Sequence, residues 1–405
     1  MAHPAGAVGS MWLDSPGHNL YYYKKNAYIW GMAADLLYSS YILDGVPMPL
    51  SPARMLRECT AQPPLEPDGD PETLADEHLD PAPDSFTFEE SALEEYAVAV
   101  EDLKRSRSLP LPFAGPYTAS KVAQALLDVV WMNGHFRLGD LTLKAEWKWN
   151  QKTMGHAAAF YESVEAACSY VDALGVKLEK YSLTAGAPAV SFKAGTVLEE
   201  DDAQQEEEDL FRDTPYRTAN PRLSRRRKAS ASFQPEASDW IIYIPFDPCD
   251  FRLGGSTLAQ AVGANPSTPA DVADADYFMD CYEVLRELVE DGIVKAGVTV
   301  GDGGLMTALR AMTSAGTGAD VSIREIAKSY GENLPVRILF SEVPGVLIQI
   351  ADIDYDYVDA ELILQDVVYF PIGHPVPGHP EVKLTSRIEI PQILESLLNT
   401  LEGED

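Results

Sequence analysis

The sequence predicts a mixed α/β (α+β) protein with two structured subdomains. Residues 117–198 combine two helical segments with a strand of alternating polarity, and residues 239–405 alternate short apolar strands with helices. A strongly charged stretch at 199–238 separates the two blocks. Because strands that alternate with helices form sheets covered by helices, we expect the second block to be an α/β sandwich.

Residues 1–116 predict a divergent, aromatic N-terminal region. Residues 26–39 lack proline and are rich in aromatic side chains and leucine, which predicts a helix that is either ordinary core or a face for a partner. A proline- and acid-rich stretch at 61–92 predicts an irregular loop. A further helix is expected at 88–103, where acidic residues open the pattern.

The block at 117–198 predicts two helices around a strand pair. The first helix is expected at 120–132 with Ser120 as its N-cap, and the second at 157–174, ending at Gly175. Residues 141–149 alternate as a strand, and one face carries apolar side chains. These side chains are Leu141, Leu143, Ala145, Trp147 and Trp149.

The stretch at 199–238 predicts a disordered insert with halves of opposite charge. It begins with the acidic run EEDDAQQEEED and continues through the basic run RTANPRLSRRRKASAS. Arg226, Arg227 and Ser230 would suit a basophilic kinase, but a solvated loop with a chance match is the favoured interpretation.

The block at 239–405 predicts five strands and three helices. The strands are expected at 240–246, 294–300, 336–340, 346–351 and 367–372. The helices are expected at 276–292, at 305–315 and around 357–364.

Charge and composition exclude several classes of protein. The chain has 31 Lys and Arg against 63 Asp and Glu, a net charge of −32, which disfavours binding to nucleic acid and to anionic lipid. The longest apolar run falls short of the roughly 18 residues that span a bilayer. Four scattered cysteines, and residues 1–19 without a targeting pattern, predict a cytoplasmic protein, either free or in a cytoskeletal or other large assembly.

Three glycine-containing segments stand out in the second block. FRLGGSTLAQ (251–260) contains Gly254 and Gly255, GVTVGDGGLMTALRAM (297–312) contains Gly303 and Gly304, and LFSEVPG (339–345) ends at Gly345. A strand that turns through glycines into a helix presents backbone N–H groups and a helix dipole to an anion. Glycines also serve tight turns without any ligand, so the spacing alone is a weak signal.

The wording of these segments is more specific than their spacing. RLGGSTLAQ, DGGLMTALRAM and LFSEVPGVLIQI resemble, in this order, the last part of phosphoribosylformylglycinamidine synthase, the ATP-dependent amidotransferase of purine biosynthesis. AQALLDVVW (123–131) is similar to that family's EALTNLVW, KAEWKW (144–149) to its SANWMW, and KAGTV (193–197) to its APGTV. The resemblance covers residues 117–373.

The resemblance implies a particular half of that enzyme. The family's core is two tandem units that resemble aminoimidazole ribonucleotide (AIR) synthetase, and this chain corresponds to the second. We therefore expect an AIR-synthetase-like N-terminal subdomain at 117–198 and an AIR-synthetase-like C-terminal α/β sandwich subdomain at 239–405.

The resemblance also implies a degenerate nucleotide and magnesium site. Gln124 and Asp128 stand where the family's EALTN helix has Glu and Asn, and Val298 and Thr299 replace the His and first Asp of its GHDxSDGG junction, of which Asp302 remains. Aligned with the family's GGKDSLSM, residues 179–184 place Lys180, Tyr181 and Ser182 in the phosphate-facing segment. We thus expect no catalytic residue, no metal and no cofactor; the alternative is that Mg and ADP or ATP still bind.

Three functions follow from this interpretation. The favoured one is a non-catalytic pseudoenzyme that serves as a structural or scaffolding subunit, with other protein subunits of a large assembly as partners and neither nucleic acid nor membrane. The intact RLGGS and LFSEVPG segments keep open a subunit of an ATP-dependent phosphoribosylformylglycinamidine synthase. The third is a nucleotide-sensing regulatory protein.

Overall fold

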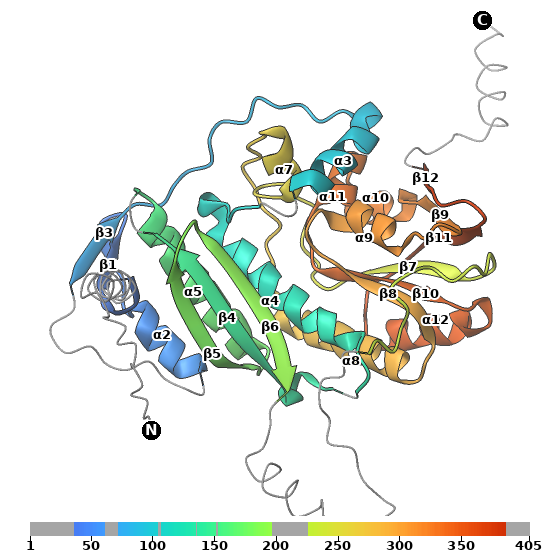
Figure 1. Cartoon of the computed structure of the whole chain (residues 1–405), viewed down its shortest axis with the longest axis horizontal. Coiled ribbons are helices and arrows are strands. Elements are labelled where there is room, and N and C mark those ends of the chain that lie inside the picture. Colours follow the sequence, from blue (N-terminus) through green and yellow to red (C-terminus); the bar gives the residue numbers. More distant parts are fainter. Residues whose placement is uncertain are drawn as a thin grey trace, which may run out of the picture.

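The computed structural model describes residues 36–60, 72–103, 107–134, 136–150, 153–196 and 226–385. Most of the predicted helix at 26–39, and the predicted insert up to residue 225, lie outside the described residues. Figure 1 shows two sheets side by side, a three-stranded and a six-stranded one, with helix α4 running between them. A small third sheet lies beside the three-stranded one.

The first half is built around strand β4. Strand β4 (Leu141–Trp149) pairs in parallel with β5 (Lys177–Ala185) and antiparallel with β6 (Ala189–Thr196). Helices α4 (Ala114–Val130) and α5 (His156–Ala173) pack against each other, and α4 also contacts β6. The predicted apolar face of β4 is confirmed, since all five of its side chains are buried.

The second half is a six-stranded sheet in the order β12-β9-β11-β7-β10-β8. Neighbouring strands are antiparallel, except for the parallel pair β12 and β9. The strands are β7 (Trp240–Pro245), β8 (Val294–Val300), β9 (Thr317–Ser322), β10 (Gly345–Ile350), β11 (Phe370–Pro377) and β12 (Val382–Thr385). The helices are α7 (Thr257–Val262), α8 (Ala275–Glu290), α9 (Gly304–Met312), α10 (Arg324–Tyr330), α11 (Pro335–Phe340) and α12 (Tyr355–Leu364).

Helices cover both faces of this sheet, so the predicted α/β sandwich is confirmed. On β7, Ile242 and Ile244 join the hydrophobic core beneath α8 and α12, whereas Ile241 and Tyr243 join a second core beneath α9 and α11. The alternation follows from the two-residue period of a strand. This arrangement positions the junction between β8 and α9 directly opposite α4.

The N-terminal region packs against both halves. Strands β1 (Ser40–Leu43), β2 (Val46–Pro47) and β3 (Thr73–Asp76) form the small sheet, and α2 (Pro52–Cys59) contacts α5. The chain then crosses to α3 (Leu93–Leu103), which contacts α7 and α9. Short 3-10 helices lie at Glu90–Ala92, Leu111–Phe113, Leu138–Asp140 and Asp352–Asp354.

Polar and sulfur contacts join the N-terminal region to α5. The Nδ1 atom of His78 lies 2.5 Å from the Asp44 carboxylate, and its Nε2 atom lies 3.3 Å from that of Glu162. The sulfurs of Cys59 and Cys168 are both buried and lie 2.9 Å apart, although 109 residues separate them in the chain. Residues 36–60 and 72–103, which match no family motif, are thus part of the same packed structure.

Four predictions for individual segments differ from the structure, and the first concerns the loop expected at 61–92, in which residues 73–76 form strand β3. Residues 336–340 were predicted as a strand but form helix α11, which begins at Pro335. Proline is well suited to the first turn of a helix, and a short buried apolar run does not distinguish helix from strand. Ser120 is not a cap, because α4 already begins at Ala114, and the last large strand lies at Phe370–Pro377 rather than at 367–372.

The described end of the charged stretch is packed rather than disordered. The N–H of Ser230 donates to the carbonyl of Lys295 in β8, and the carbonyl of Ser230 accepts from the N–H of Gly297 in the same strand. The N–H of Phe233 donates to the carbonyl of Met312. The Phe233 side chain is buried in the core beneath α9. The prediction of a disordered insert is therefore wrong for residues 226–238.

Among the described residues, the longest helices are too short or too polar to cross a bilayer.

Candidate functional site

Five of the predicted site residues line one cavity. Gln124 and Asp128 project from α4, Val298 and Thr299 lie on β8, and Asp302 lies in the turn that leads into α9. The cavity between them has a volume of about 190 Å³. Their convergence, predicted from separate sequence segments, is thus found in the structure.

The other three predicted site residues lie elsewhere. Lys180, Tyr181 and Ser182 form the middle of strand β5, where they pair with residues 144–146 of β4. Tyr181 packs against the hydrophobic core, and burial raises its pKa to about 12. The alignment with a phosphate loop was therefore wrong: residues 177–185 continue the extended chain after Gly175 and leave no glycine loop there.

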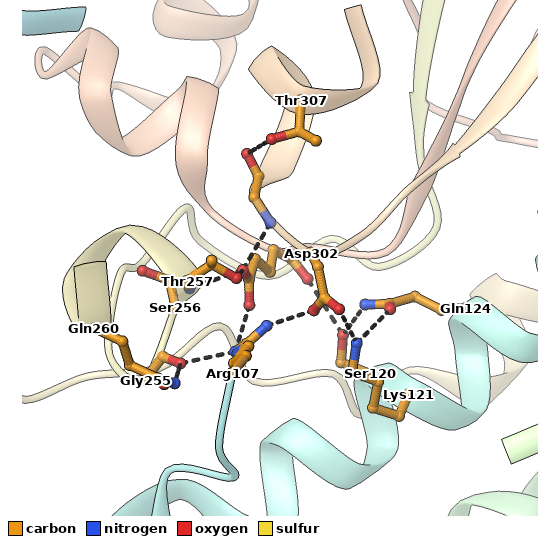
Figure 2. Close-up of polar contacts among 12 residues, drawn as sticks. Arg107, Ser120, Lys121, Gln124, Gly255, Ser256, Thr257, Gln260, Asp302 and Thr307 are labelled. Atoms are coloured by element: carbon orange, nitrogen blue, oxygen red, sulfur yellow. Dashed lines mark hydrogen bonds and ion pairs between the residues drawn. The ribbon is translucent and has the colours of Figure 1, made fainter. Parts of the chain in front are cut away.

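Asp302 is bound by two cations of its own chain. Its Oδ1 atom accepts a hydrogen bond from Nη1 of Arg107, and its Oδ2 atom lies 2.5 Å from Nζ of Lys121 (Figure 2). Lys121 also donates to the Gln124 side-chain oxygen over 3.0 Å. Both oxygens of the one carboxylate retained from the family's glycine junction thus face positive charge.

Glu342 occupies the position in front of the glycine turn. Its Oε1 atom accepts from the backbone N–H of Gly303 at 2.8 Å, and from the N–H and hydroxyl of Thr257 at 2.9 and 2.5 Å. Its Oε2 atom lies 2.8 Å from Nη2 of Arg107. The N–H of Gly303, directly before α9, and that of Thr257 at the start of α7 therefore already bind a carboxylate of the chain.

Arg107 is the centre of this arrangement. Its side chain is only 5% exposed, and besides the two carboxylates it donates to the carbonyl of Gly255 at 2.8 Å. Burial alone would lower the pKa of its guanidinium, but the charges of Glu342 and Asp302 outweigh burial and hold that pKa above its ordinary value. The guanidinium also lies 4.6 Å from the ring centre of Tyr117, at a distance suited to a cation–π contact.

The residues of the site do not fit magnesium. Magnesium takes six oxygens in octahedral array. Here Val298 offers none, the hydroxyl of Thr299 accepts a hydrogen bond from the Trp131 indole at 3.0 Å, and Asp302 is bound by Arg107 and Lys121. Within the described ranges, moreover, no group of three or more His, Cys, Asp and Glu side chains is arranged to hold a metal ion.

The space of the site is also small for a nucleotide. Around Arg107, between α4 and the loop at Gly254 and Gly255, only about 30 Å³ remains, and the neighbouring cavity has about 190 Å³. Pockets for small molecules usually measure about 300–1,000 Å³. As it stands, the site is filled by its own side chains.

The glycines of the three loops serve close packing of the backbone. A Cβ on Gly254 would lie 2.5 Å from the carbonyl oxygen of Thr268, and one on Gly345 would lie 2.7 Å from that of Ile244. Gly304 has a φ of +68°, and its Cβ would lie 2.6 Å from the carbonyl oxygen of Leu339. The remaining two, Gly255 and Gly303, also have positive φ angles.

The sequence did not indicate Arg107, Lys121 or Glu342. Arg107 lies in the segment that resembles no family motif, and nothing in a single arginine predicts burial between two carboxylates. Lys121 lies two residues before the motif AQALLDVVW, and Glu342 lies within the motif LFSEVPG. The spacing of Lys121 three residues before Gln124 was the one available signal, since such positions are neighbours on a helix.

A family model matches most of the second half of the chain. Residues 236–379 match the family model described as AIR synthase related protein, C-terminal domain. This segment is thus similar to the C-terminal domains of AIR-synthase-related proteins. It contains five of the six strands of the large sheet, β7 to β11, together with the glycine turn and Glu342.

Known proteins extend the similarity beyond this domain. The chain is 24% identical over 293 residues to human phosphoribosylformylglycinamidine synthase, covering 70% of this chain and 20% of that protein. It is 25% identical over 261 residues to a probable chloroplastic/mitochondrial phosphoribosylformylglycinamidine synthase of Arabidopsis thaliana, covering 62% and 17%. The chain thus spans about a fifth of the length of the curated relatives it matches.

A solved structure supports the fold. T. maritima PurL complexed with FGAR aligns with a TM-score of 0.51 and 16% identity, over 71% of this chain and 44% of that one. The predicted resemblance to phosphoribosylformylglycinamidine synthase and the AIR-synthetase-like α/β fold are thereby confirmed.

Proposed function

We propose that this chain is a non-catalytic relative of phosphoribosylformylglycinamidine synthase that serves as a structural subunit of a larger protein assembly. One observation carries the proposal: Arg107 and Lys121 bind Asp302, and Glu342 binds the backbone N–H of Gly303 in the glycine turn. The chain supplies from its own side chains both the cations and the anion that such a site would otherwise take from outside.

The energy of this arrangement opposes a nucleotide. A magnesium nucleotide at the turn would have to separate Arg107 from Glu342 while both are largely buried. Breaking one side of a buried ion pair costs about 3–5 kcal/mol. Since about 1.4 kcal/mol is a tenfold change in affinity, this weakens binding by roughly a hundredfold to several thousandfold.

The net charge favours proteins as partners. A chain with a net charge of −32 repels nucleic acid and anionic membranes and favours contact with basic protein surfaces. A cytoplasmic location in a large assembly agrees with this composition and belongs to the proposal.

Calorimetry tests the central part of the proposal. The full chain is titrated with ADP in the presence of Mg²⁺, and separately with Mg²⁺ alone. We expect no saturable heat with either ligand at micromolar concentrations. Saturable, stoichiometric binding of ADP with Mg²⁺ in the low micromolar range would overturn the proposal.

A second candidate rests on the cavity that remains. The space of about 190 Å³ between α4 and β8 leaves Asp128 beside Thr299 and lies next to the glycine turn. If ADP binds, phosphate release from ATP separates the two alternatives. Binding without turnover identifies a nucleotide sensor, and turnover with a separately supplied first unit identifies a synthase subunit.

A further inference from the structure

Helix α12 carries an apolar stripe on its solvent side. Within α12 the stripe consists of residues spaced three and four positions apart, which share one helix face, and Ile353 of the 3-10 helix just before α12 continues it. We call Ile353, Tyr357, Ala360 and Leu364, with the adjacent Ile363 and Val368, the α12 stripe. The exposed fractions are 89% for Ile353, 75% for Leu364, 60% for Ile363, 47% for Tyr357 and 40% for Val368.

This stripe is separate from the face by which α12 joins the fold. Val358 and Leu362 are buried and belong to the hydrophobic core under α8, on the opposite side of the helix. Figure 1 shows α12 beside α8 on the outer side of the six-stranded sheet, away from the glycine turn. A surface helix normally has one apolar and one polar face, so a second apolar face indicates a surface for a partner.

Acidic side chains surround the stripe. Residues 351–368 include six acidic residues and neither Lys nor Arg. They are Asp352, Asp354, Asp356, Asp359, Glu361 and Asp366. The negative charge around the stripe extends to the end of α8. The pKa of the Tyr357 phenol is raised by Glu361, then by burial, and further by Asp291 and Glu287 at that end.

We propose that the α12 stripe docks an amphipathic helix of a partner protein, with an apolar stripe flanked by Lys and Arg. The apolar centre supplies contact area, and the acidic surroundings select a basic rim. The inference rests on the proposed function, in which the partner is another subunit of the assembly.

Charge disfavours two occupants that this chain itself could supply, a second copy and its C-terminal segment. A second copy would bring another chain of net charge −32 and a second acidic rim against the first. Residues 386–405 contain five acidic residues and one Arg, so this segment too has the wrong sign. A basic helix from a different protein meets both requirements of the surface.

Fluorescence anisotropy with a synthetic probe tests the proposal. The probe is a labelled amphipathic helix with leucines along one face and lysines on both sides of it, and the control peptide has glutamates in place of the lysines. We expect the full chain to bind the lysine peptide saturably and to ignore the glutamate peptide. The double variant Ile353→Ser, Leu364→Ser should weaken binding about tenfold or more, since central apolar anchors dominate such contacts.

Two further variants isolate the surface from the general charge of the chain. Val46→Ser removes an equally exposed apolar side chain from β2 and should leave the affinity unchanged. The charge reversal Asp356→Lys, Asp366→Lys should weaken the lysine peptide and allow the glutamate peptide to bind. Unchanged affinity of both the serine double variant and the charge-reversal variant for the lysine peptide would mean that the net charge of the whole chain attracts the peptide, and would overturn the proposal.

Two further outcomes would show that this chain itself, as a second copy or through its C-terminal segment, covers the α12 stripe. Concentration-dependent dimers that Leu364→Ser abolishes would assign the stripe to a second copy. Tighter peptide binding after truncation at residue 385 would assign it to the C-terminal segment. Either result overturns the proposal, and neither depends on ADP, so failure here is distinguishable from failure of the proposed function.

Discussion

Replacing Arg107 by alanine tests the self-filled site most directly. The guanidinium is nearly inaccessible to solvent and binds Asp302, Glu342 and the carbonyl of Gly255. Its removal deprives the carboxylates of Asp302 and Glu342 of the cation that both contact, while Lys121 still lies 2.5 Å from Asp302. Removing one partner of a buried ion pair costs about 3–5 kcal/mol, and a pair of unit charges 4 Å apart interacts by about 4 kcal/mol at an effective dielectric constant of 20.

We therefore expect Arg107→Ala to lower the free energy of unfolding by about 3–5 kcal/mol. Urea denaturation of the full chain measures this, with tryptophan fluorescence as one signal, because Trp131 bonds to Thr299 beside the site. Far-ultraviolet circular dichroism provides the second signal and shows whether the two halves of the chain unfold together.

A double-mutant cycle with Glu342→Gln distinguishes the ion pair from mere packing. Glutamine keeps an oxygen for the N–H groups of Gly303 and Thr257 but removes the charge that faces Arg107. The loss in the double variant should be smaller than the sum of the single losses by at least about 1 kcal/mol. A loss below about 1 kcal/mol for Arg107→Ala, or strict additivity in the cycle, would refute the argument for a site held by internal charges.

Three further predictions concern other parts of the fold. The pKa of His78 is raised, because its carboxylate partners outweigh the lowering effect of burial. The charged imidazole should therefore stabilise the fold fully below about pH 6.5, and this stabilisation should vanish as the pH rises through the folded pKa. The loss of unfolding free energy in His78→Gln should follow the same course, and a loss that grows with pH would contradict this. Thermal unfolding should show a larger loss of stability for Gly304→Ala than for Gly263→Ala. Both residues have positive φ, but only the Cβ added at residue 304 would meet backbone atoms, so equal losses would disprove the clash. Glutathione disulfide should link Cys59 to Cys168 and release two glutathione molecules, as peptide mapping would show, with Cys59→Ser lacking the link.

Much of the second half could be predicted from the sequence because its elements have strong local patterns. Strand β8 has its predicted bounds of 294–300. Helix α8 begins and ends within one or two residues of its own predicted bounds of 276–292. Helix α11 was mistaken for a strand because a short, mostly apolar run fits either structure, and only the surrounding fold decides. The start of α4 was missed for a similar reason, since Pro116 lies in its first turn and the helix continues upstream of Ser120.

The site was half predictable. Gln124, Asp128, Val298, Thr299 and Asp302 converge because the motifs around them fix their positions on α4, β8 and the turn before α9. Arg107 and Glu342 form their contact across 235 positions of the chain, and no local pattern encodes such a pair. Residues 180–182 were misplaced because a shortened segment was aligned with a loop, whereas the chain needs these residues to extend β5.

The glycine loops resolve the apparent conflict between an enzyme-like sequence and a site without room for the chemistry. Their backbones approach other backbones so closely that a Cβ on Gly254 or Gly304 would overlap a carbonyl of Thr268 or Leu339. The fold therefore requires these glycines whether or not a nucleotide binds, as it requires Glu342 to satisfy the start of α9. A glycine motif of this kind reports the architecture, and the side chains that face the turn decide the function. Here those side chains are the cations of Arg107 and Lys121 and the carboxylates of Asp302 and Glu342, which neutralise one another.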